Sequence, residues 1–254
     1  MNNTGTYTRQ AARLALALLM TLGVGAGQAW AQEISLSFGD QASLTQTSIG
    51  LIGVVTILSL VPGLLIMITC FPFVVTVLSI LRQAIGLQQS PPGMLIISLS
   101  LFLTYFVMEP VFLAAWEAGI KPLSDGTMEM TEAATRAIEP FRQFMAARTA
   151  TDTFEALAEL RPGGLAEIGA IRPEAPLSVL VPSFLLSEIE RAFQIGFLIF
   201  LPFLIIDLVV AAVLMSMGMM MVPPAMVALP FKLAFFVVAD GWTLISSALV
   251  RSYF

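Results

Sequence analysis

Three charged residues interrupt an otherwise uncharged and apolar stretch over residues 192–250: Asp207, Lys232 and Asp240. A charge near the centre of a membrane helix costs a few kcal/mol, so such residues are functional candidates. Counted from a connector near Met221, Asp207 lies about 21 Å back along the helix and Lys232 about 17 Å forward. The similar depths predict a neutralising pair in facing helices, within a chain or between chains. A pair that sets packing register and a pair that couples ion movement both fit this spacing.

Hydrolytic chemistry at these charges is disfavoured. An intramembrane aspartyl protease would need Asp207 and Asp240 close enough to share a proton, but their depths differ by about 7–8 Å. A Ser–Lys hydrolase built on Lys232 lacks a serine at a recognisable spacing. Asp240 lies closer to the far membrane interface, where the following Gly241-Trp242 suits an interfacial anchor. We therefore expect a non-enzymatic protein.

Methionine is concentrated just before a proline pair, Pro223-Pro224. The side chains are Met215, Met217, Met219, Met220 and Met221, with Gly218 among them. Thioether side chains are flexible and polarizable, and they fit irregular surfaces. Two interpretations remain open at this point. The methionines either pack a helix end or form a compliant apolar constriction that closes a pore.

The composition is that of an integral membrane protein. Of 254 residues, 57% are hydrophobic and only 11% are charged, whereas about one-quarter of an average soluble domain is charged. The formal net charge of −5 argues against nucleic acid as a partner, because binding it needs clustered Lys and Arg. The chain has no histidine and a single cysteine, Cys70. These counts exclude imidazole chemistry, a zinc cluster and an intramolecular disulfide, so we expect no metal or cofactor.

The N-terminus has the features of a secretory signal peptide. Arg9 and Arg13 precede a short apolar run over residues 14–24, which is too brief to span a bilayer. Ala29 and Ala31 then supply small residues at the two positions that determine cleavage. We expect cleavage after Ala31, which would leave a mature chain of residues 32–254 with a periplasmic N-terminus.

The charge distribution predicts an all-α membrane protein in which two hydrophobic helical hairpins flank a small helical periplasmic insert. Residues 117–174 hold 16 of the 27 charges of the expected mature chain. Each apolar block can hold two spanning helices of about 20 residues, and the proline pairs at 91–92 and 223–224 divide the blocks. The expected parts are listed in order: signal peptide 1–31, N-terminal segment and first hairpin 32–116, insert 117–187, and second hairpin 188–254.

Prolines inside the expected helices predict kinks at Pro62, Pro72 and Pro202. With a periplasmic N-terminus and four crossings, both Pro-Pro connectors would lie in the cytoplasm. The positive-inside rule adds little here, because Arg82 is the only basic residue near the first connector.

The apolar blocks resemble the FliP/SctR family of type III secretion export-gate proteins over about residues 45–254. The matching stretches are SEIERAFQIGF at 187–197, LPFLIID at 201–207, MSMGMMMVPP at 215–224, LPFKL at 229–233, DGW at 240–242 and, in the first hairpin, LRQAIG at 81–86. The resemblance implies a pentameric ring of copies of this chain, joined by FliQ and FliR and by other membrane proteins of the export apparatus. It places that ring at the flagellar basal body in the inner membrane, as a pore for unfolded flagellar proteins.

The same resemblance makes Met219, Met220 and Met221, beside Gly218, the gasket of the pore. It implies no nucleotide site, and it implies that apolar helices can face protein rather than lipid once assembled. Two functional alternatives stay open: an injectisome export-gate homologue, and a small-solute secondary transporter coupled through Asp207 and Lys232. The signal peptide and the methionine loop favour the flagellar export gate.

Two departures from the family pattern affect the expected contacts between subunits. Relatives often carry Thr-Arg where Pro72-Phe73 stand, and lysine where Glu190 stands before Arg191. An ion pair between subunits at Glu188 could therefore shift by one residue. The expected intersubunit or interfacial residues are Glu188, Arg191, Arg82 and Asp240.

Overall fold

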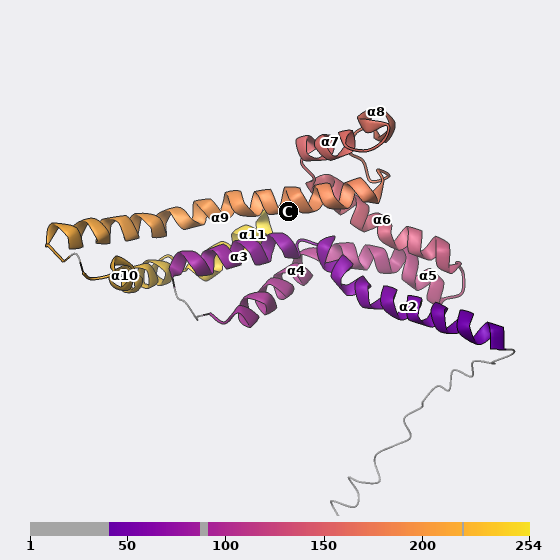
Figure 1. Ribbon diagram of the computed structural model, residues 1–254, viewed down its shortest axis with the longest axis horizontal. Helices are drawn as coiled ribbons and strands as arrows, with labels where there is room; N and C mark the ends of the chain where they lie inside the picture. The colour runs from indigo at the N-terminus through magenta and orange to yellow at the C-terminus, as the bar shows by residue number, and fades with distance from the viewer. Residues whose placement is uncertain (1–40, 87–90, 220) are drawn as a thin grey trace, which may run out of the picture. The chain divides into compact units, whose positions relative to one another are not determined.

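The computed structural model describes residues 41–86, 91–219 and 221–254, and over these ranges the regular structure is entirely helical (Figure 1). The elements are α2 (Gln41–Met67), α3 (Phe71–Ile85), α4 (Gly93–Ala115), the π-helix η1 (Trp116–Ile120), α5 (Lys121–Ser124), α6 (Met130–Arg148), α7 (Thr151–Glu159), α8 (Gly164–Ile168), α9 (Leu177–Ser216), α10 (Pro224–Val238) and α11 (Gly241–Arg251). The chain divides into two units, Met1–Val55 and Thr56–Phe254. The described part of the first unit is the beginning of α2, and the rest of α2 and all the later elements belong to the second unit.

The expected all-α class is confirmed, but two of the four expected helices are broken. Ser59–Met67 and Phe71–Ile85 meet at 70°, and Pro224–Val238 and Gly241–Arg251 meet at 61°. Pro72 lies in the first turn of α3, where a missing N–H costs nothing, so it starts a helix instead of kinking one. By contrast, α9 continues for 40 residues through Pro202.

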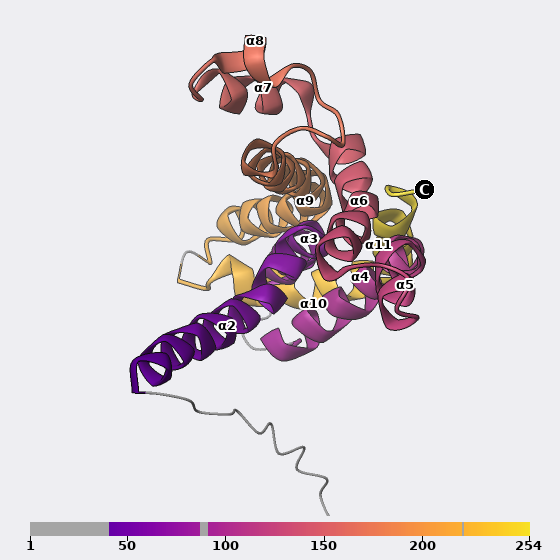
Figure 2. The ribbon, with the colours of Figure 1, turned by 90° about the vertical axis from the view of Figure 1, so that its right-hand side faces the viewer.

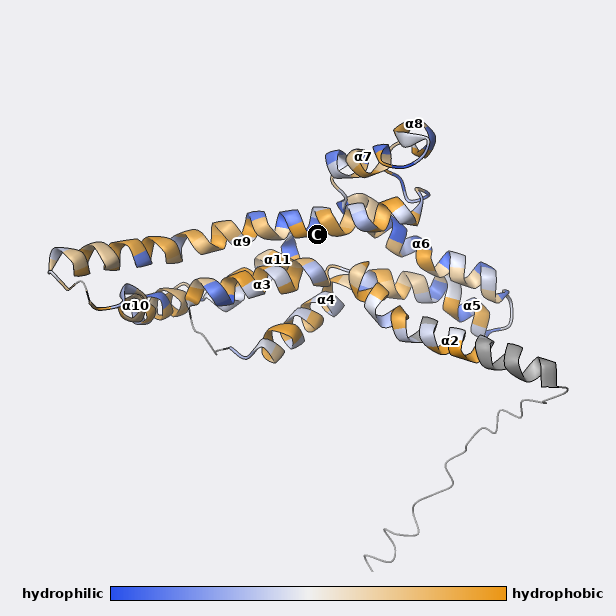
Figure 3. Cartoon of the chain, in the orientation of Figure 1, coloured by the Kyte–Doolittle hydropathy of each residue, from blue (hydrophilic) through white to orange (hydrophobic). Residues whose placement is uncertain are grey.

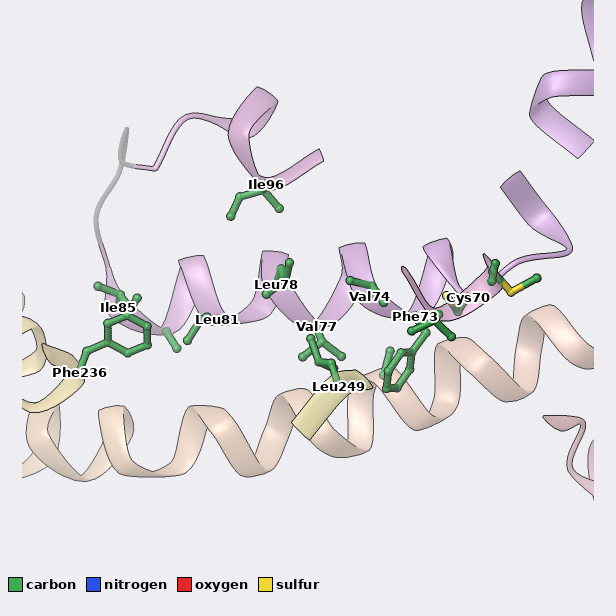
Figure 4. Packing of buried hydrophobic residues seen from close by; sticks show 14 of the residues in the cluster. Cys70, Phe73, Val74, Val77, Leu78, Leu81, Ile85, Ile96, Phe236 and Leu249 are labelled. Atoms are coloured by element: carbon green, nitrogen blue, oxygen red, sulfur yellow. The ribbon is translucent and has the colours of Figure 1, made fainter. Parts of the chain in front are cut away.

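α3 is the central helix of the larger core and lies beside α9 in both ribbon views (Figures 1 and 2). Its buried side chains line the helix from end to end (Figure 4): Phe73, Val74, Val77, Leu78, Leu81, Ala84 and Ile85. Gly196 lets α9 approach closely, because a Cβ there would lie 2.4 Å from Ile80 Cδ1. Small residues permit such approaches between apolar helices. α3 is therefore packed against protein.

The polar insert builds a second core against the first part of α9. Its buried members are Met145, Phe154, Ala158, Ile168, Ala175, Val179, Leu180 and Phe184. α9 begins at Leu177 and runs unbroken past the boundary expected at 187/188, and the boundary expected at 116/117 falls inside η1. The insert and the second hairpin therefore share one helix. That sharing gives a rigid connection between the insert and the end of α9.

Two described helical segments are long and apolar enough to cross a membrane, Gly93–Ser124 and Leu177–Ser216. The number rises to four if each bent pair counts as one span. Only 11% of the most apolar window of Leu177–Ser216 is buried within the chain, and Figure 3 shows hydrophobic colours along most of α9 but bluer ones on α6 to α8. Exposed apolar surface of this size marks a lipid or protein contact.

Candidate functional site: the methionine loop and two buried ion clusters

The loop between α9 and α10 begins with a helix C-cap that needs glycine. Gly218 has a φ of +77°, its N–H bonds to the carbonyl of Met215 at 3.0 Å, and the Met219 N–H bonds to the carbonyl of Leu214 at 3.0 Å. This pair of bonds is a Schellman motif, which satisfies the last carbonyls of α9 with a left-handed residue. The chain therefore turns sharply at Gly218, and the methionines that follow leave the helix axis.

The loop ends at the proline pair, with Pro223 as the N-cap of α10 and Pro224 as its first residue. The described methionine side chains at this loop are not part of the core of this chain. Met217 is 65% exposed, Met219 38% and Met221 98%. Met220 lies outside the described residues. Packing of the helix end within the chain therefore does not explain the described methionines of this loop.

An ion pair joins the two helices that carry this loop. Lys232 Nζ lies 2.6 Å from Asp207 Oδ2 and donates a second hydrogen bond to the Ala84 carbonyl at 3.0 Å. Lys232 is buried, whereas the Asp207 side chain is 34% exposed. Asp207 Oδ1 is buried without a hydrogen-bond partner among the described residues. The structure thus brings together, within one chain, the two charges whose depths we had matched along the sequence.

Asp240 is at the break between α10 and α11, in a left-handed conformation with φ 48° and ψ 47°. Its Oδ1 accepts a hydrogen bond from the Thr243 hydroxyl at 3.1 Å. Trp242 packs edge-on against Phe236, with ring centroids 5.4 Å apart. Because Asp207 is paired with Lys232, the described geometry provides no aspartyl dyad.

The second cluster surrounds Glu188, which is fully buried. Arg148 Nε lies 3.1 Å from Glu188 Oε1 and Arg191 Nη1 lies 3.6 Å from it. The Tyr253 hydroxyl donates to the other oxygen, Oε2, and Arg148 also donates to the Ser252 carbonyl at 2.8 Å. We had expected Glu188 to face another subunit, but its carboxylate is enclosed and bonded within its own chain.

Tyr253 follows α11 and lies outside the segments that could span a membrane. Burial raises the pKa of its phenol above the ordinary value, and the neighbouring Glu188 carboxylate raises this pKa further. Neither Arg148 nor Tyr253 was identified from the sequence. They lie 40 and 65 residues from Glu188, and no periodic pattern relates positions that far apart.

Of the remaining candidates, Arg191 belongs to the Glu188 cluster, whereas Arg82 belongs to α3. Arg82 is partly exposed on α3, and its Nη1 would lie 3.4 Å from a Cβ on Gly93, the first residue of α4. The Arg191 side chain is 36% exposed, so it is accessible to another chain while touching Glu188. Ala29 and Ala31 lie outside the described residues.

Comparison with known proteins identifies the family. A model described as the FliP family matches residues 54–249. The chain belongs to the FliP family. It is similar to the flagellar biosynthetic protein FliP of Caulobacter vibrioides, with 47% identity over 96% of this chain and 91% of that protein. The corresponding protein of Rhizobium meliloti is 42% identical over 94% and 96%, and that of Bacillus subtilis 44% identical over 85% and 96%.

Among the described residues of this FliP-family chain there is no group of three or more His, Cys, Asp or Glu that could hold a metal ion. A pocket of about 530 Å³ lies beside the methionine loop between α9 and α10. Its lining is apolar and includes Met217 and Phe231 but no ionisable group. The described lining of this pocket therefore offers apolar contact.

Proposed function

We propose that this chain is a core subunit of the flagellar type III secretion export gate and forms the inner-membrane pore for unfolded flagellar proteins. The observation that carries the proposal is the methionine loop of a FliP-family chain, capped by Gly218 and exposed to 98% at Met221. Several copies of such a loop around one axis would close a pore with apolar side chains. The role is structural and requires no catalytic step.

Thioethers suit a gate through which chains of any sequence must pass. They seal by close contact, and they make no hydrogen bonds that would select a particular substrate. A rigid frame is needed behind such a soft seal. The cap at Gly218 fixes where the chain leaves α9, and the Asp207–Lys232 pair joins α9 to α10 several turns away from the loop.

The proposed partners are further copies of this chain in a pentameric ring, FliQ, FliR, other membrane proteins of the export apparatus, membrane lipid and unfolded flagellar substrates. The long exposed apolar face of α9 supports contacts with protein or lipid. Its exposed side chains include Phe193, Phe197, Leu208 and Val213. The partly exposed Arg82 and Arg191 and the exposed Asp240 remain our candidates for interfacial contacts.

We propose the inner membrane and the flagellar basal body as the location, with the insert 117–187 in the periplasm. The support is the concentration of charge in the insert, the long apolar helices on either side of it and the expected signal peptide. Labelling a cysteine placed at the exposed Glu155 with a membrane-impermeant maleimide tests the side. We expect the maleimide to react in cells whose outer membrane has been permeabilised and whose inner membrane is intact.

The experiment that tests the function is an in-frame deletion complemented by the full chain. We expect the deletion strain to lose swimming and to release no flagellar filament proteins into the medium. The wild-type chain should restore both. A deletion strain that swims and exports flagellar proteins but has lost injectisome secretion would favour the injectisome alternative. A strain that has lost only uptake of a solute would favour the transporter.

A further inference from the structure

Lys232 connects three helices: its own and two others. It belongs to α10, its Nζ is 2.6 Å from Asp207 Oδ2 on α9, and the same atom is 3.0 Å from the Ala84 carbonyl on α3. The side chains buried on α10 are Ala228, Lys232 and Phe236, each four residues from the next. One face of α10 therefore packs inward, and Lys232 is its only charged member.

The bond to Ala84 lies at the C-terminal end of α3, where helical carbonyls lack partners. The last four carbonyls of a helix have no intrahelical donor, and the helix dipole makes this end attractive to a cation. Gly86 ends α3 with a φ of 83°, and its own N–H bonds to the Gln83 carbonyl. Lys232 thus donates to the Ala84 carbonyl, which the turn at Gly86 does not bond. This carbonyl belongs to α3, the central helix of the core.

An apolar contact accompanies this polar one. Phe236 lies one turn beyond Lys232 and belongs to the same buried cluster as Ile85, and Figure 4 shows the two side chains next to each other. The last turn of α3 is therefore held by α10 at two points. The Asp207 carboxylate holds the same ammonium from α9, so a shift of the α9–α10 hairpin against α3 must break a bond of Lys232.

We propose that Lys232 is a positioning residue that fixes the hairpin carrying the methionine loop to the C-terminal turn of α3. This inference rests on the proposed gate function for its consequence, because it makes α3 the fixed reference against which the loop is held. Asp207 alone cannot perform this role, since its described partner is Lys232 and not a group on α3. The ammonium is the group that joins all three helices.

The two ends of α3 allow a direct test in membranes that contain the full chain. Cys70, the only cysteine, is fully buried at the N-cap of α3 and reports opening of the whole core to N-ethylmaleimide. Ile85→Cys adds a second thiol at the C-terminal turn, where Ile85 is 3% exposed. The rate at each thiol is measured in the Lys232→Met, Lys232→Arg and Asp207→Asn variants. Lys121→Met, at the other lysine of the chain, is the matched control.

Lys232→Met is expected to raise the labelling rate at Ile85→Cys about tenfold or more, because local opening becomes easier once the buried charge contacts are lost. Cys70 should stay protected, and Lys121→Met should change neither rate. Lys232→Arg should return most of the protection. Asp207→Asn should have a smaller effect than Lys232→Met, because the ammonium keeps its bond to Ala84.

An unchanged labelling rate at Ile85→Cys in the Lys232→Met variant would overturn the proposed positioning role of Lys232. Equal exposure of both thiols through global unfolding would overturn it as well. So would an effect of Asp207→Asn as large as that of Lys232→Met. Ion leak and flagellar export are followed in the same cells. If the Lys232→Met variant exposes the thiol of Ile85→Cys but shows normal export and no leak, the proposed gate function is contradicted. The positioning role of Lys232 would still stand.

Discussion

The guanidinium carbon of Arg148 lies 4.1 Å from the centroid of the Tyr253 ring, and both side chains donate hydrogen bonds to the buried carboxylate of Glu188. The Tyr253 ring also meets Phe73 of α3 edge-on at 5.5 Å and stacks with Phe144 of α6 at 6.0 Å. One residue near the end of the chain therefore contacts α3, α6 and α9. It ties the insert to the apolar helices.

The hydroxyl of Tyr253 should contribute measurably to stability. Tyr253→Phe keeps the ring contacts but leaves one buried oxygen of Glu188 without its donor, at a cost of about 1–3 kcal/mol. The measurement is thermal unfolding of the detergent-solubilised protein. Tyr105→Phe is the control, because Tyr105 is 61% exposed. Equal unfolding temperatures for the Tyr253→Phe variant and the wild type would show that the hydrogen bond is energetically neutral.

The same tyrosine predicts a pH dependence. Its pKa in the folded chain is raised above the ordinary value of 10.0 by burial first and by the Glu188 carboxylate second. A raised pKa means that the folded state favours the neutral phenol, so this contribution is complete below the unfolded pKa and declines as pH rises beyond it. The stability difference between wild type and Tyr253→Phe should be constant from about pH 7 to about pH 9 and shrink above about pH 10. A difference that widens at alkaline pH would contradict the assignment.

How far the sequence could predict these clusters depends on chain separation. Asp207 and Lys232 flank one connector, so counting helical rise from Met221 was enough to match their depths. Two partners of Glu188, Arg148 and Tyr253, lie 40 and 65 residues away, beyond helix ends and turns whose geometry no local pattern specifies. The ion pair was therefore predictable in outline, and the Arg148–Glu188–Tyr253 cluster was not.

The two helix breaks carried signals that hydropathy obscured. Pro72 can start a helix as readily as kink one, and Asp240-Gly241 is a dipeptide typical of turns. Averaged apolarity is high on both sides of each break, so each block was interpreted as two spanning helices, with a kink expected at Pro72 and none at Asp240-Gly241. The second contact of Lys232, to a backbone carbonyl of α3, could not be predicted for a different reason: every residue has a carbonyl, so the sequence does not indicate which one is bonded.

The Asp207–Lys232 pair predicts non-additive losses. Asp207→Asn leaves the Lys232 ammonium without its counter-ion, and Lys232→Met leaves the Asp207 carboxylate without its cation, each at a cost of about 3–5 kcal/mol for a fully buried pair. The Asp207 side chain is 34% exposed, so solvent screens the pair, and both losses should lie at or below the lower limit. The double variant should regain part of the assembly seen on native gels. Losses that simply add would exclude direct coupling.

The N-terminus predicts cleavage after Ala31. Small side chains at Ala29 and Ala31 fit the signal peptidase requirement, and the apolar run at 14–24 is too short to remain as a span. N-terminal sequencing of the membrane-extracted protein should begin at Gln32. Replacing Ala29 with a bulky residue should leave a longer form on the same gel. Recovery of Met1 or Asn2 from the assembled protein would instead indicate a retained anchor.

The final prediction concerns the seal. Met219→Ala, Met220→Ala and Met221→Ala together shorten the side chains of the loop but leave Gly218, the proline pair and the Asp207–Lys232 pair in place. Because the described methionines of the loop are exposed and outside the core, the triple variant should assemble normally on native gels. It should let ions and small solutes leak across the membrane, while flagellar export persists at least in part.

A matched control separates sealing from methionine content. Met94, Met130 and Met226 are 75%, 69% and 72% exposed but lie outside the loop, so their combined replacement by alanine removes the same number of thioethers. If the loop seals by close apolar contact, only the loop variant leaks, because alanine is too short to reach across the axis while the backbone stays fixed by its caps. Equal leak from both triple variants would trace the effect to a loosened assembly. An assembled loop variant without leak, under conditions that open the gate, would return these methionines to a packing role.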